Sequence, residues 1–227
     1  RKLLSNRNLA IAAGMVLAFF LFQFFRAPAQ EIYLAKGPMN TGHANLKCAD
    51  CHKEASGTSR QQLQYNAKVF LTLSDADYVY FGNLPVTPNE CLACHNRPND
   101  NHPTHRFMEP RFADARKAIH PESCISCHQE HHGKRITITP MDYCMNCHRD
   151  IEIKNDPLDP SHASLIEQEQ WSTCLQCHDF HGNHIFEVPT QFSDTIPIKA
   201  LLDYADGKED PYGELKEYIA DSILRKP

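Results

Sequence analysis

The chain has 227 residues and a formal net charge of -5 at pH 7. This charge excludes a basic surface that would attract nucleic acid, and no Lys/Arg cluster with interleaved aromatic residues occurs beyond the N-terminal end. Hydrophobic residues make up 41% of the chain, but many of them fall in the first 25 positions. The remainder is too poor in aliphatic residues for a core built from side chains alone.

The first expected element is a membrane anchor over residues 1–27. Residues 9–25 are apolar except for Gln23, and as a helix they would span about 25 Å. Three basic residues lie in the first seven positions, so the positive-inside rule keeps the N-terminus cytoplasmic and sends the rest across the membrane. A cleaved signal peptide is the alternative, because residues 27–29 read Ala-Pro-Ala, like a processing site. We expect a retained single span.

A linker is expected over residues 28–42, which are rich in Pro and Gly, and a cofactor-binding domain over residues 43–184. Within that domain, residues 60–81 form the longest stretch without a cysteine motif, and they are compatible with a short helix.

The ten cysteines of the chain form five pairs of one spacing, and a histidine follows each pair directly. The motifs are Cys48-Ala49-Asp50-Cys51-His52, Cys91-Leu92-Ala93-Cys94-His95, Cys124-Ile125-Ser126-Cys127-His128, Cys144-Met145-Asn146-Cys147-His148 and Cys174-Leu175-Gln176-Cys177-His178. Cys-x-x-Cys-His lets two thiols form thioethers with one porphyrin while the histidine reaches its iron. The sequence therefore predicts five covalently bound haem c groups.

Other uses of cysteine fit this pattern less well. A disulfide framework does not require a histidine after every second cysteine. Zinc sites combine two pairs per metal, and five is an odd number of pairs. A thioredoxin-like pair would occur once, near a βαβ pattern that the sequence lacks. Haem would also replace the missing aliphatic core, which predicts a mostly irregular and α-helical fold organised around the cofactors. Only 15 residues separate the third motif from the fourth, so we expect these two sites to be neighbours in space.

Nine further histidines lie between residues 43 and 184, and they supply candidates for the second axial ligand of each iron. His131 and His181 each follow a motif histidine by three residues and rank first. The next candidates lie before or between motifs: His43, His102, His120 and His162. His105, His132 and His184 are reserves. A methionine could replace one histidine and raise that haem's potential, the candidates being Met39, Met108 and Met141.

Residues 185–227 are expected to form an acidic tail, with 9 acidic and 5 basic residues and no Cys or His. Asp210-Pro211 resembles a helix start, and Leu215, Ile219 and Ile223 recur every four residues. We expect an amphipathic helix here, which either packs on its own domain or docks on a partner subunit.

The motifs, together with free histidines such as His131 in His128-Gln129-Glu130-His131, resemble the class III multihaem cytochromes c over residues 43–184. With its anchor and five motifs the chain also resembles the pentahaem, membrane-attached subunit of alternative complex III. It departs from the tetrahaem quinol-dehydrogenase anchors in having five motifs and no Met near the first. That departure argues against direct quinol oxidation by this chain alone.

The expected function is electron transfer by a non-enzymatic haem protein, anchored in the bacterial inner membrane with its haem domain on the periplasmic side. The resemblance implies a quinol-linked donor, and protein partners in an electron-transfer complex are expected. A multihaem reductase of a small nitrogen or sulfur compound is the alternative. It would need an iron with an open position, but no Cys-x-x-Cys-Lys variant marks a special haem.

Overall fold

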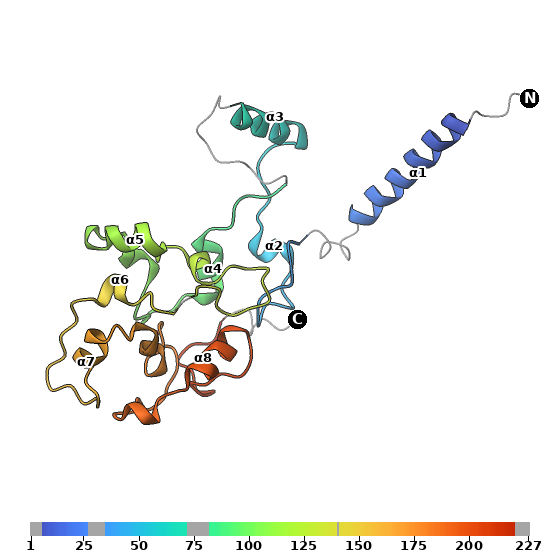
Figure 1. The fold of residues 1–227 in the computed structure, drawn as a ribbon. Helices are drawn as coiled ribbons and strands as arrows, with labels where there is room; N and C mark the ends of the chain where they lie inside the picture. Colours follow the sequence, from blue (N-terminus) through green and yellow to red (C-terminus); the bar gives the residue numbers. More distant parts are fainter. Residues whose placement is uncertain (1–5, 27–34, 72–81, 140, 221–227) are drawn as a thin grey trace, which may run out of the picture. The chain divides into compact units, whose positions relative to one another are not determined.

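The computed structural model describes residues 6–26, 35–71, 82–139 and 141–220. It divides into two units, residues 1–38 and 39–227. Figure 1 shows short helices joined by long irregular segments. Among the described residues there are isolated β-bridges but no strands. The fold is therefore helical and irregular, as the sequence predicts.

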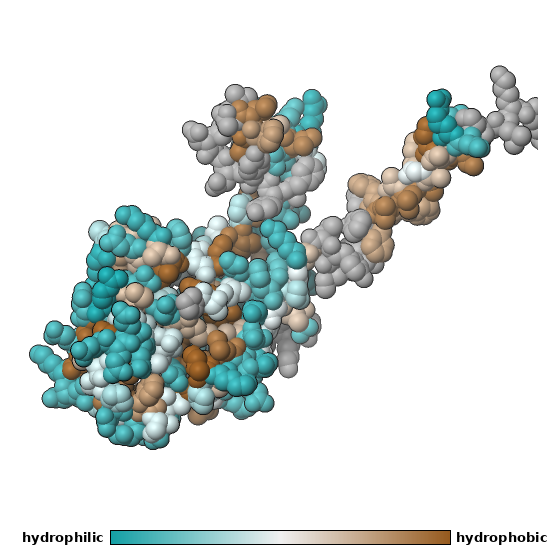
Figure 2. All heavy atoms as spheres, in the orientation of Figure 1, coloured by the Kyte–Doolittle hydropathy of each residue, from teal (hydrophilic) through white to brown (hydrophobic). Residues whose placement is uncertain are grey.

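The first unit contains one long helix, α1 (Asn6–Arg26). Residues 6–24 of α1 have a mean hydropathy of 1.6, which is enough in length and composition to cross a membrane, although a signal sequence has the same features. Apolar side chains cover most of the helix (Figure 2). Most of the predicted linker, residues 27–34, lies outside the described part of the chain.

The second unit carries all five motifs on short helical turns. Its elements in chain order are α2 (Cys48–Cys51), α3 (Ser59–Phe70), α4 (Pro88–His95), η2 (Thr104–Met108), η3 (Pro110–Phe112), α5 (Ala113–Ile119), η4 (Cys124–Ser126), α6 (Met145–His148), α7 (His162–Glu167), η5 (Trp171–Gln176), η6 (Phe192–Asp194) and α8 (Ile198–Ala205). The helix expected within residues 60–81 is confirmed as α3. Thr58 caps its N-terminus by accepting a hydrogen bond from the Gln61 amide.

One small apolar core lies in the second unit, and the C-terminal region contributes half of it. The core joins Met141, Tyr143, Leu175, Leu201, Ala205 and Tyr212. Leu201 and Ala205 lie one turn apart on α8 and form its buried face. The Arg135 side chain holds the C-terminal end of this helix, donating to the Tyr204 carbonyl at 2.6 Å.

The prediction of a helix that starts at Asp210-Pro211 is wrong for the described residues. Residues 206–220 form turns and bends, and they bond to residues 183–185 just after motif 5. The amphipathic helix of the tail is α8 instead. We call residues 206–220 the C-terminal strap. Leu215 and Ile219 on this strap are 67% and 57% exposed, and Ile223 lies outside the described residues.

Candidate haem sites

Each Cys-x-x-Cys-His motif forms one tight turn that brings its thiols and imidazole together. We number the motifs 1 to 5 along the chain. In four of them the histidine amide bonds back to the carbonyl of the first cysteine, at 2.8 to 3.0 Å for motifs 1, 3, 4 and 5. None of the ten cysteines, all of which are described, forms a disulfide. Every thiol pair is therefore available for one porphyrin.

Every motif histidine faces one further histidine from elsewhere in the chain. The five pairs, with the distances between ring centroids, are His52 with His131 at 6.2 Å, His95 with His43 at 5.9 Å, His128 with His181 at 6.2 Å, His148 with His102 at 5.9 Å, and His178 with His162 at 6.1 Å. No histidine appears in two pairs. We call the pairs sites 1 to 5, after the motif that each contains.

The spacing within the pairs fits two imidazoles on opposite sides of one metal ion. A metal bond to an imidazole nitrogen is about 2.0–2.1 Å long and that nitrogen lies about 1.1 Å from the ring centroid, which puts the two centroids about 6.2–6.4 Å apart. The observed distances of 5.9 to 6.2 Å lie at or slightly below the lower end of this range. Direct stacking of two rings without a metal would permit closer approach. The residues present thus fit a six-coordinate haem iron at each site.

Hydrogen bonds hold several paired imidazoles through Nδ1, which leaves Nε2 for a metal. Nδ1 of His43 lies 2.9 Å from Glu130, that of His162 lies 2.8 Å from Asp156, and that of His181 lies 3.0 Å from Asp100. Two others face backbone carbonyls, with His128 Nδ1 at 2.6 Å from Arg135 and His102 Nδ1 at 2.5 Å from Phe180. These contacts fix both the orientation of the ring and the nitrogen that is free.

The surroundings of several paired histidines favour the neutral imidazole, which is the form that binds a metal. Burial, with a smaller contribution from Arg97, lowers the pKa of His95 to about 4. Burial also lowers the pKa values of His102, His128 and His178. His43 differs, because its hydrogen bond to Glu130 raises its pKa.

The structure does not bring His120, one of the six foremost second-ligand candidates, to a motif histidine. His120 ends α5 in a left-handed conformation with φ of 47°, and its side chain is 66% exposed. Its Nδ1 lies 3.3 Å from Glu122 instead. His120 stands four residues before a motif, much as His43 stands five before one, so spacing alone could not separate them.

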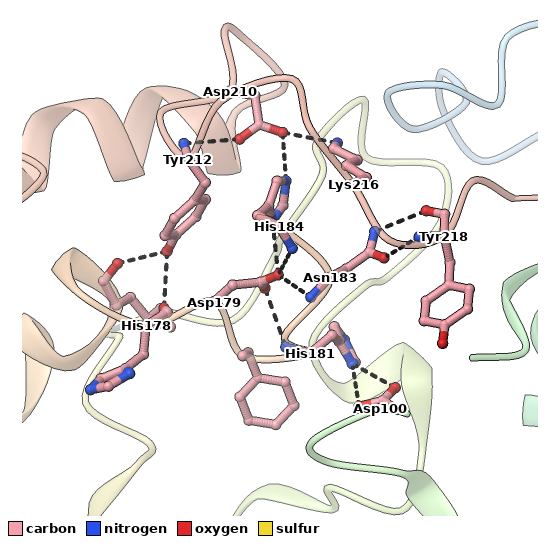
Figure 3. Close-up of polar contacts among 12 residues, drawn as sticks. Asp100, His178, Asp179, His181, Asn183, His184, Asp210, Tyr212, Lys216 and Tyr218 are labelled. Atoms are coloured by element: carbon pink, nitrogen blue, oxygen red, sulfur yellow. Dashed lines mark hydrogen bonds and ion pairs between the residues drawn. The ribbon is translucent and has the colours of Figure 1, made fainter. Parts of the chain in front are cut away.

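The three reserve histidines are also unpaired with motif histidines. His105 and His132 are exposed. His184 is buried, and both of its ring nitrogens lie 2.8 Å from a carboxylate, Asp179 on one side and Asp210 on the other (Figure 3). An imidazole held in this way has no nitrogen left for a metal, so its role is structural.

The methionine candidates have other surroundings. Met141 is 4% exposed in the apolar core, and Met108 is 63% exposed. With all five motif histidines already paired, packing describes Met141 better than ligation does.

Consecutive motifs lie beside one another in the second unit. The helices of motifs 1 and 2, α2 and α4, are in contact. The thiols of Cys91 and Cys124 in motifs 2 and 3 interact, which lowers the pKa of Cys124 to about 7. Ser126 and Asn146, inside motifs 3 and 4, line one cavity of about 470 Å³.

Motifs 4 and 5 meet in the same manner. The Cys144 thiol interacts with that of Cys174, whose pKa is lowered to about 7. Motif 1 thus lies against motif 2, motif 2 against motif 3, and motif 4 against motif 5.

Residues 40–149, which contain motifs 1 to 4, match the cytochrome c3 family. This chain carries a cytochrome c3-like multihaem domain. Such a domain binds haem c covalently and transfers electrons. No curated protein and no solved structure was found to match the chain.

The sequence reasoning missed the carboxylates behind the paired histidines of the multihaem cytochrome. Asp100 precedes His102 by two residues, Glu130 precedes His131, and Asp156 precedes His162 by six. An acidic residue shortly before a candidate histidine was therefore a usable signal. It does not identify the partner, since Glu130 bonds His43 and Asp100 bonds His181.

Proposed function

We propose that this chain is a membrane-anchored pentahaem cytochrome c that conducts electrons through five six-coordinate haems. The observation that carries the proposal is the one-to-one pairing of all five motif histidines with five other histidines. Bound haem supplies one-electron exchange at its iron. The chain supplies two thiols and a first imidazole from each motif, and a second imidazole from another segment.

The order of the motifs in space supports a conducting path from site 1 to site 5. Motif 1 contacts motif 2, motif 2 contacts motif 3, motif 4 contacts motif 5, and motifs 3 and 4 line one cavity, so each haem would have a neighbour on the route. The second ligands cross between segments, with His131 beside motif 3 serving site 1 and His181 beside motif 5 serving site 3. These crossings tie neighbouring sites together and hold their separations fixed.

The pairing also argues against the alternative, a multihaem reductase of a small nitrogen or sulfur compound. Such an enzyme needs an iron with an open coordination position. Each of the five motif histidines has an imidazole opposite it, and methionine is not needed at any site. We therefore propose that the protein is an electron carrier and not an enzyme.

The remaining parts of the proposal concern place and partners. Residues 6–24 support a single membrane span with the haem domain on the periplasmic side, in the bacterial inner membrane. A quinol-linked donor and a position in a respiratory complex like alternative complex III follow from the resemblance in plan. The exposed Leu215 and Ile219 of the C-terminal strap offer a contact for such a partner.

Haem content and spin state test this function. We expect an intact mass with five haem groups per chain and an oxidised spectrum without a high-spin component. His131→Ala and His181→Ala should each convert one haem in five to high spin, because each removes one axial ligand.

His120→Ala is the matched control, since it removes an unpaired histidine and should leave every haem low spin. Four haems or fewer would contradict the pentahaem assignment. A low-spin spectrum after both ligand substitutions would overturn the pairing.

A further inference from the structure

Three carboxylates stand directly behind paired imidazoles, at three different sites. Glu130 contacts Nδ1 of His43 at site 2, Asp100 contacts that of His181 at site 3, and Asp156 contacts that of His162 at site 5. In each case the contact occupies Nδ1 and leaves Nε2 for a metal, in a ring whose centroid lies 5.9 to 6.2 Å from that of the motif histidine. Each carboxylate therefore contacts an imidazole that would bind the metal, and not the metal itself.

Site 4 has a different acceptor. There His102 Nδ1 faces the carbonyl oxygen of Phe180, a neutral group. Among the described residues no carboxylate bonds to the imidazole ring of His102 or His148, the two histidines of this site, and Asp100 accepts only the backbone amide of His102. The chain thus places anionic acceptors on some sites and a neutral acceptor on another.

Backbone donors fix each carboxylate in place. Glu130 also accepts the Asn40 amide at 2.6 Å, and Asp100 also accepts the amide of His102 at 2.8 Å. Asp156 accepts the amide of His162 at 2.7 Å. The positions of these anions relative to the imidazoles are therefore set by the fold.

The carboxylates are also partly shielded from water. Their side chains are 28%, 15% and 14% exposed for Glu130, Asp100 and Asp156. Charges in such positions are screened by salt less than charges on the open surface. Their influence on a nearby charge change is correspondingly larger.

An anionic acceptor on Nδ1 draws the proton of the ring toward itself and makes the imidazole a stronger donor to a metal. The oxidised iron gains more from a stronger donor than the reduced iron does. Hydrogen bonds to the ligands and the net charge near the iron both act on the reduction potential of a haem. A carboxylate at this position therefore favours the ferric state and lowers the potential.

We propose that Glu130, Asp100 and Asp156 are positioning residues that lower the reduction potentials of sites 2, 3 and 5. The proposal rests on the pentahaem function above and adds how the reduction potentials differ from site to site. Site 4, with its carbonyl acceptor, lacks this effect and is reduced more readily for the same surroundings. Asp100 contacts two sites of different kinds. It bonds the imidazole of His181 at site 3, which has a carboxylate acceptor, and the backbone amide of His102 at site 4, which has a carbonyl acceptor.

The test replaces each carboxylate with its amide in the full chain, as Glu130→Gln, Asp100→Asn and Asp156→Asn. An amide oxygen keeps an acceptor for the backbone donor but removes the charge. Spectroelectrochemical titration should show one of five components shifted to a higher potential in each variant. The expected size is at least about tenfold in the one-electron equilibrium, which corresponds to 59 mV.

Glu122→Gln is the matched control. Glu122 contacts Nδ1 of His120, an imidazole that faces no motif histidine, and it lies two residues before motif 3. It therefore removes a charge near site 3 without removing a contact to a paired imidazole. Its titration should resemble that of the unmodified chain.

Spin state separates failure of this inference from failure of the proposed function. Low-spin variants whose five potentials are all unchanged would overturn the tuning role and leave the pairing intact. A shift as large in Glu122→Gln as in Asp100→Asn would also overturn it, because net charge alone would then explain the effect. If His181→Ala leaves site 3 low spin, the pairing itself is wrong and the potentials have another origin.

Discussion

His184 shows how a single residue can attach the C-terminal strap to the haem-binding segment. Its side chain is 5% exposed and lies between Asp179, next to motif 5, and Asp210 on the strap. Lys216 adds a second cation on Asp210 at 2.9 Å (Figure 3). A buried imidazolium between two carboxylates is strongly stabilised only while all three groups keep their charges.

The charge state of His184 predicts a pH dependence of stability. Burial opposes protonation, but the hydrogen bonds to Asp179 and Asp210 outweigh it and raise the pKa of His184 above 6.5. A raised pKa gives a stabilisation that is complete below the unfolded value and is lost as the pH rises through the folded value. The melting temperature should therefore fall as the pH rises above about 6.5 and through the raised pKa of His184.

His184→Gln is the comparison for this measurement. At about pH 6 its free energy of unfolding should be lower by about 1–3 kcal/mol, and its melting temperature should be lower too. Its melting temperature should also depend less on pH above about 6.5. An equal fall of melting temperature with pH in both proteins would assign the dependence to other groups.

At the scale of residues, sequence predicted the first ligand of each site but not the assignment of the second. The Cys-x-x-Cys-His turn is local, so its residues and its geometry follow from five consecutive positions. The partner of His131 depends on how motif 3 approaches motif 1, which is a long-range contact. His120 and His43 look alike in sequence, and only the fold separates the exposed residue from the paired one.

The helix α8 attaches the C-terminal region to the apolar core through one buried face. Leu201 is 2% exposed in the apolar core, whereas Leu202, its neighbour on the same helix, is 45% exposed. Leu201→Ala should lower the free energy of unfolding by about 2–5 kcal/mol, because it opens a cavity in a small core. Leu202→Ala should cost about 0.5 kcal/mol or less.

Far-ultraviolet circular dichroism, which follows the loss of helix, reports unfolding in denaturant. Equal midpoints for the two variants would contradict the burial of this helix face. Haem content should be the same in both, since the thioether bonds persist on unfolding.

Local helix signals explain why the tail helix was predicted in the wrong place. Asp210-Pro211 has the chemistry of a helix start, but Asp210 accepts hydrogen bonds from His184 and Lys216 instead. Tyr212 turns inward, and its hydroxyl donates to the Leu175 carbonyl at 2.6 Å. Tertiary contacts thus outweighed the local preference, whereas α3, capped within its own sequence by Thr58, was predicted correctly.

At the scale of the molecule, the remaining prediction concerns attachment to the membrane. Residues 6–24 would span about 28 Å as a helix, which is close to the thickness of a bilayer's hydrocarbon core. We expect the protein to remain with membranes after washing in high salt. Deletion of residues 1–29 should release a haem protein with an unchanged low-spin spectrum.

The N-terminus of the mature protein distinguishes anchor from signal peptide. A soluble mature protein that begins near Gln30 would show that the helix is removed after export. Retention of the helix, with loss of membrane association only on deletion, would show that it is the anchor.

The crossing of the second ligands has a consequence for how the protein matures. If the chain emerges from its N-terminus and haem is attached as each motif appears, a site is complete only when both of its histidines have emerged. Site 2 closes first, at His95, and sites 1, 4 and 5 follow at His131, His148 and His178. Site 3 waits for His181 and is the last to gain its second histidine. Site 3 would therefore be the last of the five pairs to close, although its motif is only the third to emerge.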